Sequence, residues 1–430
     1  MLASALPAGA ARAARVPGEV VVTYAKQTGP AARARVLRGA GARATQVVSG
    51  RTRVLEVQAG ASVDATVRAL RADPRVAAAA PNPIAHAAGY IPTDPGGGSL
   101  IGGWQSLQWN FDGPYGVNAP EAWSNLMRAG RPGGKGVTVA VLDTGIAYAD
   151  HGRFRRSPDF RPSHFVAPYD FVGRDRRPDD ENGHGTHVAG TINEATGNDV
   201  ALTGLAYGAR IMPVRVLDRY GDGDSVAISR GVRYAVRHHA DVINLSFEFD
   251  MSTSRRDVPD LLAALREAQR QGVLVVAASG NEGDGALAFP ARAPSVLSVG
   301  ATTEHGCAAD YSNSGATLDL VAPGGGPDAD LPGDPRCSLD GTSGRNIFQL
   351  TFTGSVGRFG IPRDYEGTSM ATPHVSATAA LVIASGVLGP HPSPTALVRR
   401  LEATARPLGS ARHYGAGLLD AAAATAPAAP

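Results

Sequence analysis

The sequence contains little cysteine and no long apolar run. Its two cysteines, Cys307 and Cys337, are too few for a disulfide-rich scaffold of the kind that stabilises small secreted domains. They show no CxxC or Cys/His spacing, which argues against a zinc or redox site built on such motifs. Either one disulfide closing a surface loop or two free thiols is compatible with this pattern, because sequence does not place the two Cα atoms.

Apolar runs stay well short of the roughly 20 residues that a membrane-spanning helix needs, so we expect no membrane span and a soluble mature protein. Basic residues are scattered and do not alternate with aromatics, so we expect no nucleic-acid partner. The net charge is only +2, yet residues 1–86 contain twelve basic and four acidic side chains. A basic front segment attracted to an acidic body would explain this asymmetry, and so would chance in an arginine-rich sequence.

The N-terminal residues are small and mildly apolar and end in Ala-Arg-Ala, as a signal-peptidase site does. They lack the basic start and the long apolar centre of a full signal peptide. We interpret residues 1–16 as a signal remnant or a disordered N-terminus and expect a secreted, extracellular protein. Residues 425–430 are expected to be a disordered tail.

Residues 17–86 are expected to form a small α+β unit. Four β-rich runs, GEVVVTY, ATQVV, RTRVLEVQ and PRVAAAA, alternate with two helical patterns, at 31–39 and 62–72. The order βαββαβ predicts a ferredoxin-like sheet. Residues 87–107, rich in glycine and proline, are expected to form a linker and the N-terminal segment of the mature protein.

From residue 108 to 424, apolar β-type runs alternate with helical patterns. Such alternation predicts an α/β fold in which a parallel sheet has helices on both faces. In such sheets, ligands bind beyond the carboxyl ends of the strands, so we look for chemistry directly after predicted strands. A stretch at 326–363 is interpreted as an insert on the rim near the active site.

Three short motifs contain the side chains that peptide hydrolysis by serine requires. Asp143 ends the strand VTVAVLD, His184 lies in NGHGTHVAGT, and Ser369 lies in EGTSMATPHVS at the start of a long apolar helix. A hydroxyl nucleophile needs a base to take its proton and a carboxylate to orient that base. We therefore predict a catalytic triad of Asp143, His184 and Ser369.

The order Asp, His, Ser and the motifs VLDTG, HGTHVAG and GTSMATPH resemble the subtilisin family of serine peptidases, over about residues 108–422. The resemblance implies a serine endopeptidase acting through an acyl-enzyme. It also implies that Asn281, in VVAASGNEG, donates its side-chain amide to the oxyanion, and that Ser246, Phe247, Glu248 and Gly280 bind substrate. An esterase of the α/β-hydrolase class would instead need G-x-S-x-G and the chain order Ser, Asp, His.

Other positions near these motifs receive structural interpretations. His187 and His374 are expected to pack near the site without acting as bases. Pro373 is expected in the first turn of its helix, where the missing N–H is tolerated. The family usually continues as Ser-Leu-Gly-Gly where this chain has Ser246-Phe247-Glu248-Phe249. Glu248 is expected either to favour basic substrate side chains or to face solvent.

The same resemblance implies a structural calcium ion, although the chemistry itself needs no cofactor. Asp159 in SPDF and Asn198 in TGNDVALTG match the positions of one site, with loop carbonyls completing the ligands. Asp175, together with Asp179 and Asp180, is a weaker second candidate. Acidic surface loops without metal are the alternative for both groups.

The front unit resembles the inhibitory propeptide of the same family, which assists folding and blocks the cleft until it is removed. We therefore expect a self-processed precursor cut between Ala85 and Tyr90, whose partners are protein substrates and its own propeptide. A permanent binding domain is the alternative for this unit. A catalytically inactive scaffold would have lost a triad residue, and none is lost. We expect a monomer.

Overall fold

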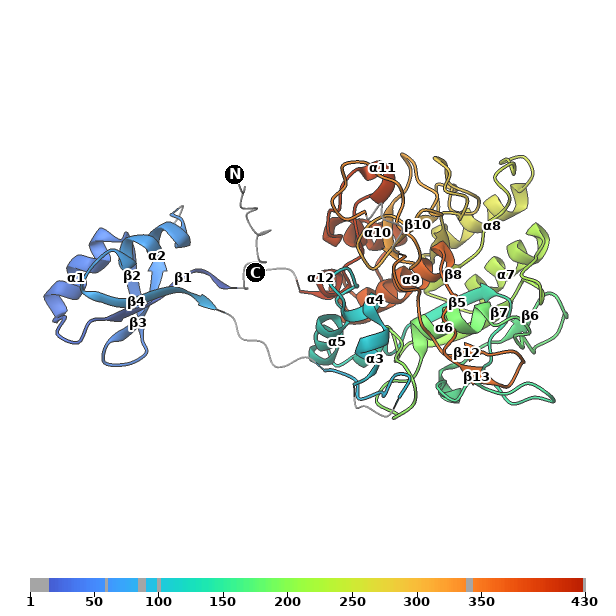
Figure 1. The fold of residues 1–430 in the computed structure, drawn as a ribbon, viewed down its shortest axis with the longest axis horizontal. Coiled ribbons are helices and arrows are strands. Elements are labelled where there is room, and N and C mark those ends of the chain that lie inside the picture. The colour runs from blue at the N-terminus through green and yellow to red at the C-terminus, as the bar shows by residue number, and fades with distance from the viewer. Residues whose placement is uncertain (1–14, 59–60, 84–89, 99–101, 338–342, 428–430) are drawn as a thin grey trace. The chain divides into compact units, whose positions relative to one another are not determined.

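The structure is a computed structural model that describes residues 15–58, 61–83, 90–98, 102–337 and 343–427. The chain forms two compact units, residues 1–88 and residues 89–430 (Figure 1). The expected cleavage region between Ala85 and Tyr90 and the predicted signal remnant lie almost entirely outside the described residues. Within the described residues, no helix combines the length and apolarity required to cross a membrane.

The first unit is a four-stranded antiparallel sheet with two helices. Its elements in chain order are β1 (Arg15–Tyr24), α1 (Pro30–Gly39), β2 (Ala42–Val47), β3 (Thr52–Val57), α2 (Val63–Arg71) and β4 (Val76–Pro83). The sheet order is β2-β3-β1-β4, which confirms the predicted ferredoxin-like arrangement. In the second half of β1, every second residue (Val20, Val22 and Tyr24) is fully buried, as expected when side chains alternate along a strand.

The second unit is built on a sheet of seven strands, which is parallel as predicted. Its strands, in spatial order, are β11 (Leu320–Pro323), β10 (Leu297–Thr302), β9 (Leu274–Ala278), β8 (Val242–Leu245), β5 (Thr138–Asp143), β7 (Arg210–Arg215) and β6 (Tyr169–Asp170). The β5 run is buried throughout. Val139 and Val141 enter one hydrophobic core, and Ala140 and Leu142 enter the other. This two-sided burial explains why the strand is continuously apolar.

Helices cover both faces of this sheet (Figure 1). One core includes residues of α5 (Ala119–Arg128), α6 (His184–Asn193), α9 (Thr368–Ser385) and α12 (Ala421–Thr425), and the other includes residues of α7 (Ser225–Arg237) and α8 (Pro259–Arg270). The remaining elements are α3 (Trp104–Leu107), α4 (Trp109–Asp112), η1 (Pro132–Gly134), η2 (Pro162–His164), β12 (Thr351–Phe352), β13 (Phe359–Gly360), α10 (Pro394–Thr404) and α11 (Ala411–Tyr414).

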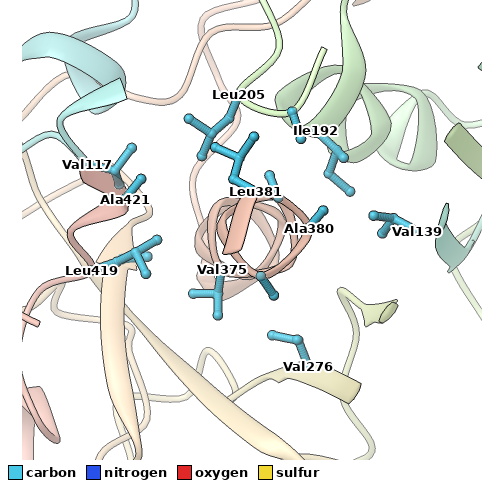
Figure 2. Close-up of a cluster of buried hydrophobic side chains, with 14 of the residues drawn as sticks. Val117, Val139, Ile192, Leu205, Val276, Val375, Ala380, Leu381, Leu419 and Ala421 are labelled. Carbon is cyan, nitrogen blue, oxygen red and sulfur yellow. The ribbon is translucent and has the colours of Figure 1, made fainter. Parts of the chain in front are cut away.

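The helix α9 runs through the first core and is apolar on all sides because nearly all of it is buried. Figure 2 shows Val375, Ala380 and Leu381 of this helix surrounded by side chains of the sheet, of neighbouring helices and of the segments between them. The surrounding side chains labelled there are Val117, Val139, Ile192, Leu205, Val276, Leu419 and Ala421. Packing in this core therefore fixes the position of α9, whose second residue is Ser369.

Candidate active site

Asp143 and His184 meet at the carboxyl edge of the sheet. Asp143 is the last residue of β5 and is fully buried, and His184 is the first residue of α6. Gly183 precedes the helix with φ +109°, a conformation that glycine adopts without strain. His184 Nδ1 lies 2.7 Å from Asp143 Oδ1, and the N–H of Thr144 donates to the same oxygen at 2.7 Å. The carboxylate is thus placed to orient the imidazole.

The pKa of His184 reflects two opposing effects. Burial lowers the pKa, but the charge of Asp143 and the hydrogen bond that His184 donates to its carboxylate together raise it by more, so the pKa lies above its usual value of 6.5. The pair can therefore stabilise the imidazolium that forms when His184 takes a proton.

Asp180 fixes the turn that leads into His184. Its Oδ1 accepts hydrogen bonds from the N–H groups of Asn182 and Gly183 and from Thr144 Oγ1, and its Oδ2 accepts two from Thr186. The carboxylate thus links the turn before α6 to the residue after Asp143. Sequence reasoning placed Asp180 in a weak metal site and missed this role.

Ser369 is the second residue of α9, so it lies in the first turn of that helix. Its Oγ donates to the carbonyl of Ser246 at 3.0 Å, and in the described part of the chain it forms no hydrogen bond to His184. The helices α6 and α9 pack against each other, which brings both residues to one region. Catalytic hydrogen bonds are often long or poorly aligned before substrate binds, so the lack of this bond in the free protein does not argue against a triad.

Pro373 lies in the second turn of α9, so the prediction of a first-turn proline was wrong. The helix begins at Thr368, which places Pro373 where it cannot donate to the carbonyl of Ser369. Ser246 Oγ donates to that carbonyl instead, at 2.9 Å. Ser246, the residue after β8, therefore supplies the hydrogen bond that Pro373 cannot donate to the carbonyl of Ser369.

Asn281 follows β9, and its side chain is held at both ends. Its Oδ1 accepts hydrogen bonds from the N–H of Thr368 at 2.8 Å and from Thr368 Oγ1 at 2.9 Å. With the oxygen held there, the Nδ2 group is directed away from Thr368, and it donates to Glu248 Oε1 at 3.1 Å. An amide nitrogen has two hydrogens, so one remains for a further acceptor.

The four predicted substrate-binding residues differ in how far they are buried. Ser246 is buried in contact with Ser369, as described above, and Phe247 is only 8% exposed and packs in the second core. The side chain of Phe247 therefore contributes to this core, and its contact with substrate stays a prediction. Gly280, at φ +115°, lies so close to Glu248 that a Cβ would come within 2.6 Å of Oε2.

The two histidines that we interpreted as structural are both buried. His187 Nε2 donates to the carbonyl of Ile347 at 3.1 Å, and its ring stacks on Tyr365 with centroids 4.2 Å apart. His374 contacts Asn110 and the carbonyl of Met370. Burial lowers the pKa of His187 to about 3 and that of His374 to about 4, so both stay neutral.

Asp159 and Asn198, the first calcium candidates, are in direct contact. Asn198 Nδ2 donates to Asp159 Oδ1 at 2.9 Å, and the N–H of Leu202 donates to Oδ2. A third residue, Asp94, accepts hydrogen bonds from the N–H groups of Gly197 and Asn198. Sequence reasoning missed Asp94 because it lies in a glycine-rich segment that looked like a linker.

These residues fit a calcium ion in part. Burial raises the pKa of Asp159 and the charge of Asp94 adds to this effect, while the hydrogen bonds from Asn198 and Leu202 and the charge of Arg161 offset it only in part. An Asn side chain and carboxylate oxygens are suitable calcium ligands. However, no three acidic, His or Cys side chains of the described residues converge as a metal site. Loop carbonyls would have to supply most ligands.

The second calcium candidate is not supported by the structure. Asp175 accepts from the N–H of Arg177, Asp179 lies 3.3 Å from His151, and Asp180 is fully engaged near His184. The three carboxylates therefore interact with three different neighbours and do not form one cluster. Spacing in the sequence suggested a cluster because it does not show which neighbour each carboxylate faces.

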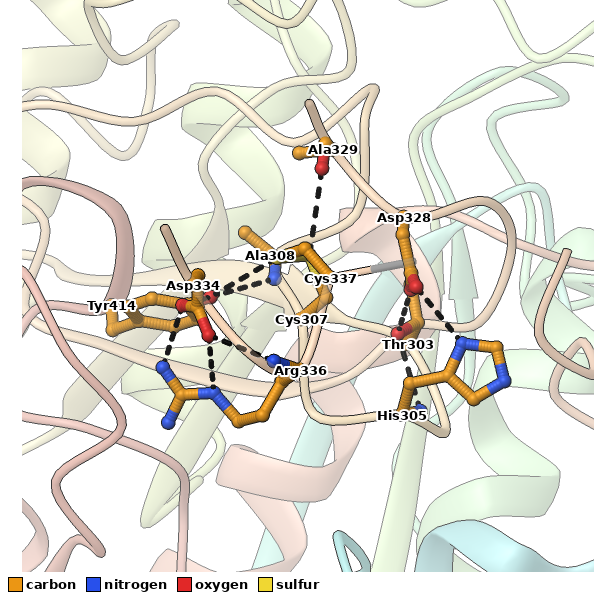
Figure 3. The surroundings of a disulfide bond; sticks show 10 residues. All are labelled: Thr303, His305, Cys307, Ala308, Asp328, Ala329, Asp334, Arg336, Cys337 and Tyr414. Carbon is orange, nitrogen blue, oxygen red and sulfur yellow. Dashed lines mark hydrogen bonds and ion pairs between the residues drawn. A yellow bond between two sulfur atoms is a disulfide. The ribbon is translucent and has the colours of Figure 1, made fainter. Parts of the chain in front are cut away.

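The two cysteines form a disulfide, with Cα atoms 4.9 Å apart (Figure 3). The bond links Cys307, after β10, to Cys337 in the segment that we interpreted as an insert. Close by, Asp334 accepts a hydrogen bond from Tyr414 and forms an ion pair with Arg336. The first half of the insert is therefore tied to the rim of the second unit.

The second half of the segment 326–363 differs from the expected rim decoration. Ile347 is fully buried, and its carbonyl faces His187. Thr351 Oγ1 donates at 2.7 Å to the carbonyl of Gly183, the residue before His184. This part of the segment is apolar because it packs behind α6, so it supports the helix that begins at His184.

Comparison with known proteins agrees with this geometry. Residues 134–417 match the subtilase family, and residues 4–82 match the fervidolysin N-terminal prodomain. Subtilisin Savinase of Lederbergia lenta is 36% identical over 321 residues, which cover 75% of this chain and 99% of that protein. A thermophilic serine proteinase of Bacillus sp. (strain AK1) is 34% identical over 378 residues, covering 87% of this chain and 80% of that protein.

Solved structures give the same result. A protease of Pseudoalteromonas arctica aligns with a TM-score of 0.62 and 28% identity, covering 78% of this chain and 99% of that one. A cold-adapted subtilisin-like serine proteinase aligns with a TM-score of 0.51 and 30% identity, covering 67% of this chain and 88% of that one. By its sequence motifs, its fold and these similarities, the chain belongs to the subtilase family of serine endopeptidases.

Proposed function

We propose that the protein is a secreted endopeptidase that hydrolyses peptide bonds through an acyl-enzyme on Ser369. The observation that supports this most strongly is the 2.7 Å pair of Asp143 and His184 at the sheet edge where Ser369 and Asn281 also lie. Carboxylate, imidazole, hydroxyl and amide are the groups that this reaction requires.

In the first half of the proposed reaction, Ser369 Oγ attacks the peptide carbonyl carbon while His184 Nε2 takes the hydroxyl proton. The Asp143 carboxylate, bonded to Nδ1, keeps the imidazole oriented and compensates its positive charge. The negative oxygen of the tetrahedral intermediate accepts hydrogen bonds from Asn281 Nδ2 and the N–H of Ser369, which has no partner within its helix. His184 then gives its proton to the leaving amine.

In the second half, His184 takes a proton from a water molecule that attacks the acyl-enzyme. The same two donors stabilise the second tetrahedral intermediate, and His184 returns the proton to Ser369 Oγ. The chemistry needs no metal in these steps, because proton transfer and charge stabilisation are supplied by side chains and backbone of this chain.

We further propose that the protein is made as a precursor. Residues 17–86 would act as an inhibitory propeptide, and residues 108–424 as the peptidase. The fervidolysin-type prodomain match supports this division, as does the excess of basic residues in the front segment over an acidic remainder. Secretion and a monomeric state are part of the same proposal, as is a structural calcium ion held by Asp159 and Asn198 with Asp94.

The test compares the full chain with a Ser369→Ala variant, following mass and casein hydrolysis over time. We expect only the wild-type chain to lose about 85–90 residues, the length of the front unit, and then to digest casein. A Ser376→Ala variant, which changes a serine of the same helix, is the control and should be processed. Casein hydrolysis by Ser369→Ala, or a wild-type chain that stays intact and inactive, would contradict the proposal.

A further inference from the structure

Glu248 stands in a fixed position two residues after Ser246. On one side of it, Phe247 is buried in the second core. On the other side, the N–H of Phe249 donates to the carbonyl of Phe289 at 2.8 Å, and the Phe249 ring packs against the same core. The segment that carries the carboxylate is therefore anchored on both sides, so Glu248 does not swing freely into solvent.

The carboxylate of Glu248 binds the oxyanion donor directly. Its Oε2 accepts from the backbone N–H of Asn281 at 2.9 Å, and its Oε1 accepts from Asn281 Nδ2 at 3.1 Å. The absence of a side chain at Gly280 gives the carboxylate the space for this approach. The opposite end of the Asn281 side chain is held by Thr368. Glu248 and Thr368 together set the orientation of the amide.

The charge of Glu248 is not neutralised by a cation of this chain. In the part of the chain that the structure describes, no ion pair joins Glu248 to a Lys, Arg or His side chain. The neighbouring charged group is another carboxylate, Glu282, whose Oε2 accepts from Asn313 Nδ2. Burial, and next the charge of Glu282, raise the pKa of Glu248. A positive group brought to this place would thus be stabilised.

The substrate can supply such a group. The oxygen that Asn281 stabilises belongs to the carbonyl of the residue before the scissile bond. The side chain of that residue is attached to the Cα atom next to this carbonyl carbon. A carboxylate hydrogen-bonded to the oxyanion donor is therefore within reach of a long basic side chain at that position. With an uncharged side chain, the same carboxylate leaves its negative charge close to the developing oxyanion and opposes it.

Resting on the proposed endopeptidase function, we propose that Glu248 makes the enzyme selective for Lys or Arg immediately before the scissile bond. The cation pairs with the carboxylate, offsets its charge beside the oxyanion, and leaves Asn281 Nδ2 free to donate to the substrate. Glu248 is thus a specificity-determining and positioning residue.

The test uses two peptides that differ only in having Arg or citrulline before the cleaved bond, because citrulline keeps the shape of Arg without its charge. For the wild-type enzyme we expect kcat/KM for Arg to exceed that for citrulline by at least ~30-fold, a preference that weakens at high salt. In Glu248→Gln the ratio should fall to about threefold or less, because kcat/KM for the Arg peptide falls when the carboxylate that pairs with its cation is removed.

Asp250→Asn provides the matched control, since it removes a carboxylate from the same segment that is exposed and bonded to Ser252. Its Arg-to-citrulline ratio should equal that of the wild type. If the enzyme cleaves casein but its Arg-to-citrulline ratio is near one, the inference is overturned and the proposed function stands. The same holds if the ratio is unchanged in Glu248→Gln. An enzyme that cleaves neither peptide nor casein overturns both.

Discussion

His184 is the side chain on which the proposed reaction depends most, because it takes up and returns a proton in each half of the cycle. Only the neutral imidazole can accept the proton of Ser369. Burial would lower the pKa of His184, but Asp143 raises it above 6.5 overall. The enzyme should therefore lose its base as the pH falls through a value higher than that of an ordinary histidine.

This predicts the acid side of the pH profile. We expect kcat/KM for an uncharged peptide to rise with pH through an apparent pKa above 6.5, the reference value for His184. Asp143→Asn removes the charge that raises this pKa, so the residual activity, lower by about 10⁴-fold in kcat, should show a lower acid limb. Profiles measured between about pH 5 and pH 9 check this. An acid limb that is the same in both proteins would contradict it.

At the same scale, the sequence indicated the residues that we propose to react but not the residues that position them. Asp143, His184, Ser369 and Asn281 lie in short motifs whose chemistry can be read locally. Asp180 acts on Thr144, 36 residues away, and Asp94 acts on Asn198, 104 residues away. Such roles follow from the fold, so no local pattern indicates them.

Among the elements, the sheet strands and α9 were predictable because burial on two faces demands continuous apolar runs. The error at Pro373 arose from the start of α9, since the helix begins at Thr368 and the proline therefore lies in its second turn, where an N–H is normally needed. The segment 326–363 was interpreted as a surface insert because its first half is rich in glycine, proline and aspartate. Its second half proved to be core, packed behind α6.

The calcium prediction rests on Asp159, which lies before η2, and on Asn198, which lies in the loop between α6 and β7. In Ser369→Ala protein, used to prevent self-digestion, a chelator should lower Tm by about 8 °C, the shift expected when calcium at ~1,000 times its Kd contributes about 4 kcal/mol. Asp159→Asn should lower Tm and abolish the response to chelator, because it removes a ligand charge. Asp175→Asn, on an exposed carboxylate, is the control and should respond as its parent does. A Tm that no variant and no chelator changes would contradict the calcium proposal.

For the whole molecule, composition and pattern were sufficient to predict two units of different architecture, a small antiparallel sheet followed by a large parallel one. The structure has both, and each matches its own family over most of its length. The disulfide of Cys307 could not be predicted, because pairing depends on whether the chain between the cysteines folds back.

The central claim is that Ser369 is the nucleophile of a working triad. The most direct measurement is labelling of the processed protein with a fluorophosphonate, followed by mass spectrometry to count and locate the adduct. We predict one adduct per molecule, on Ser369, with no labelling of Ser369→Ala and strongly slowed labelling of His184→Ala, which lacks the base. An adduct on a different serine, or processed and folded protein that takes up no label, would contradict the account.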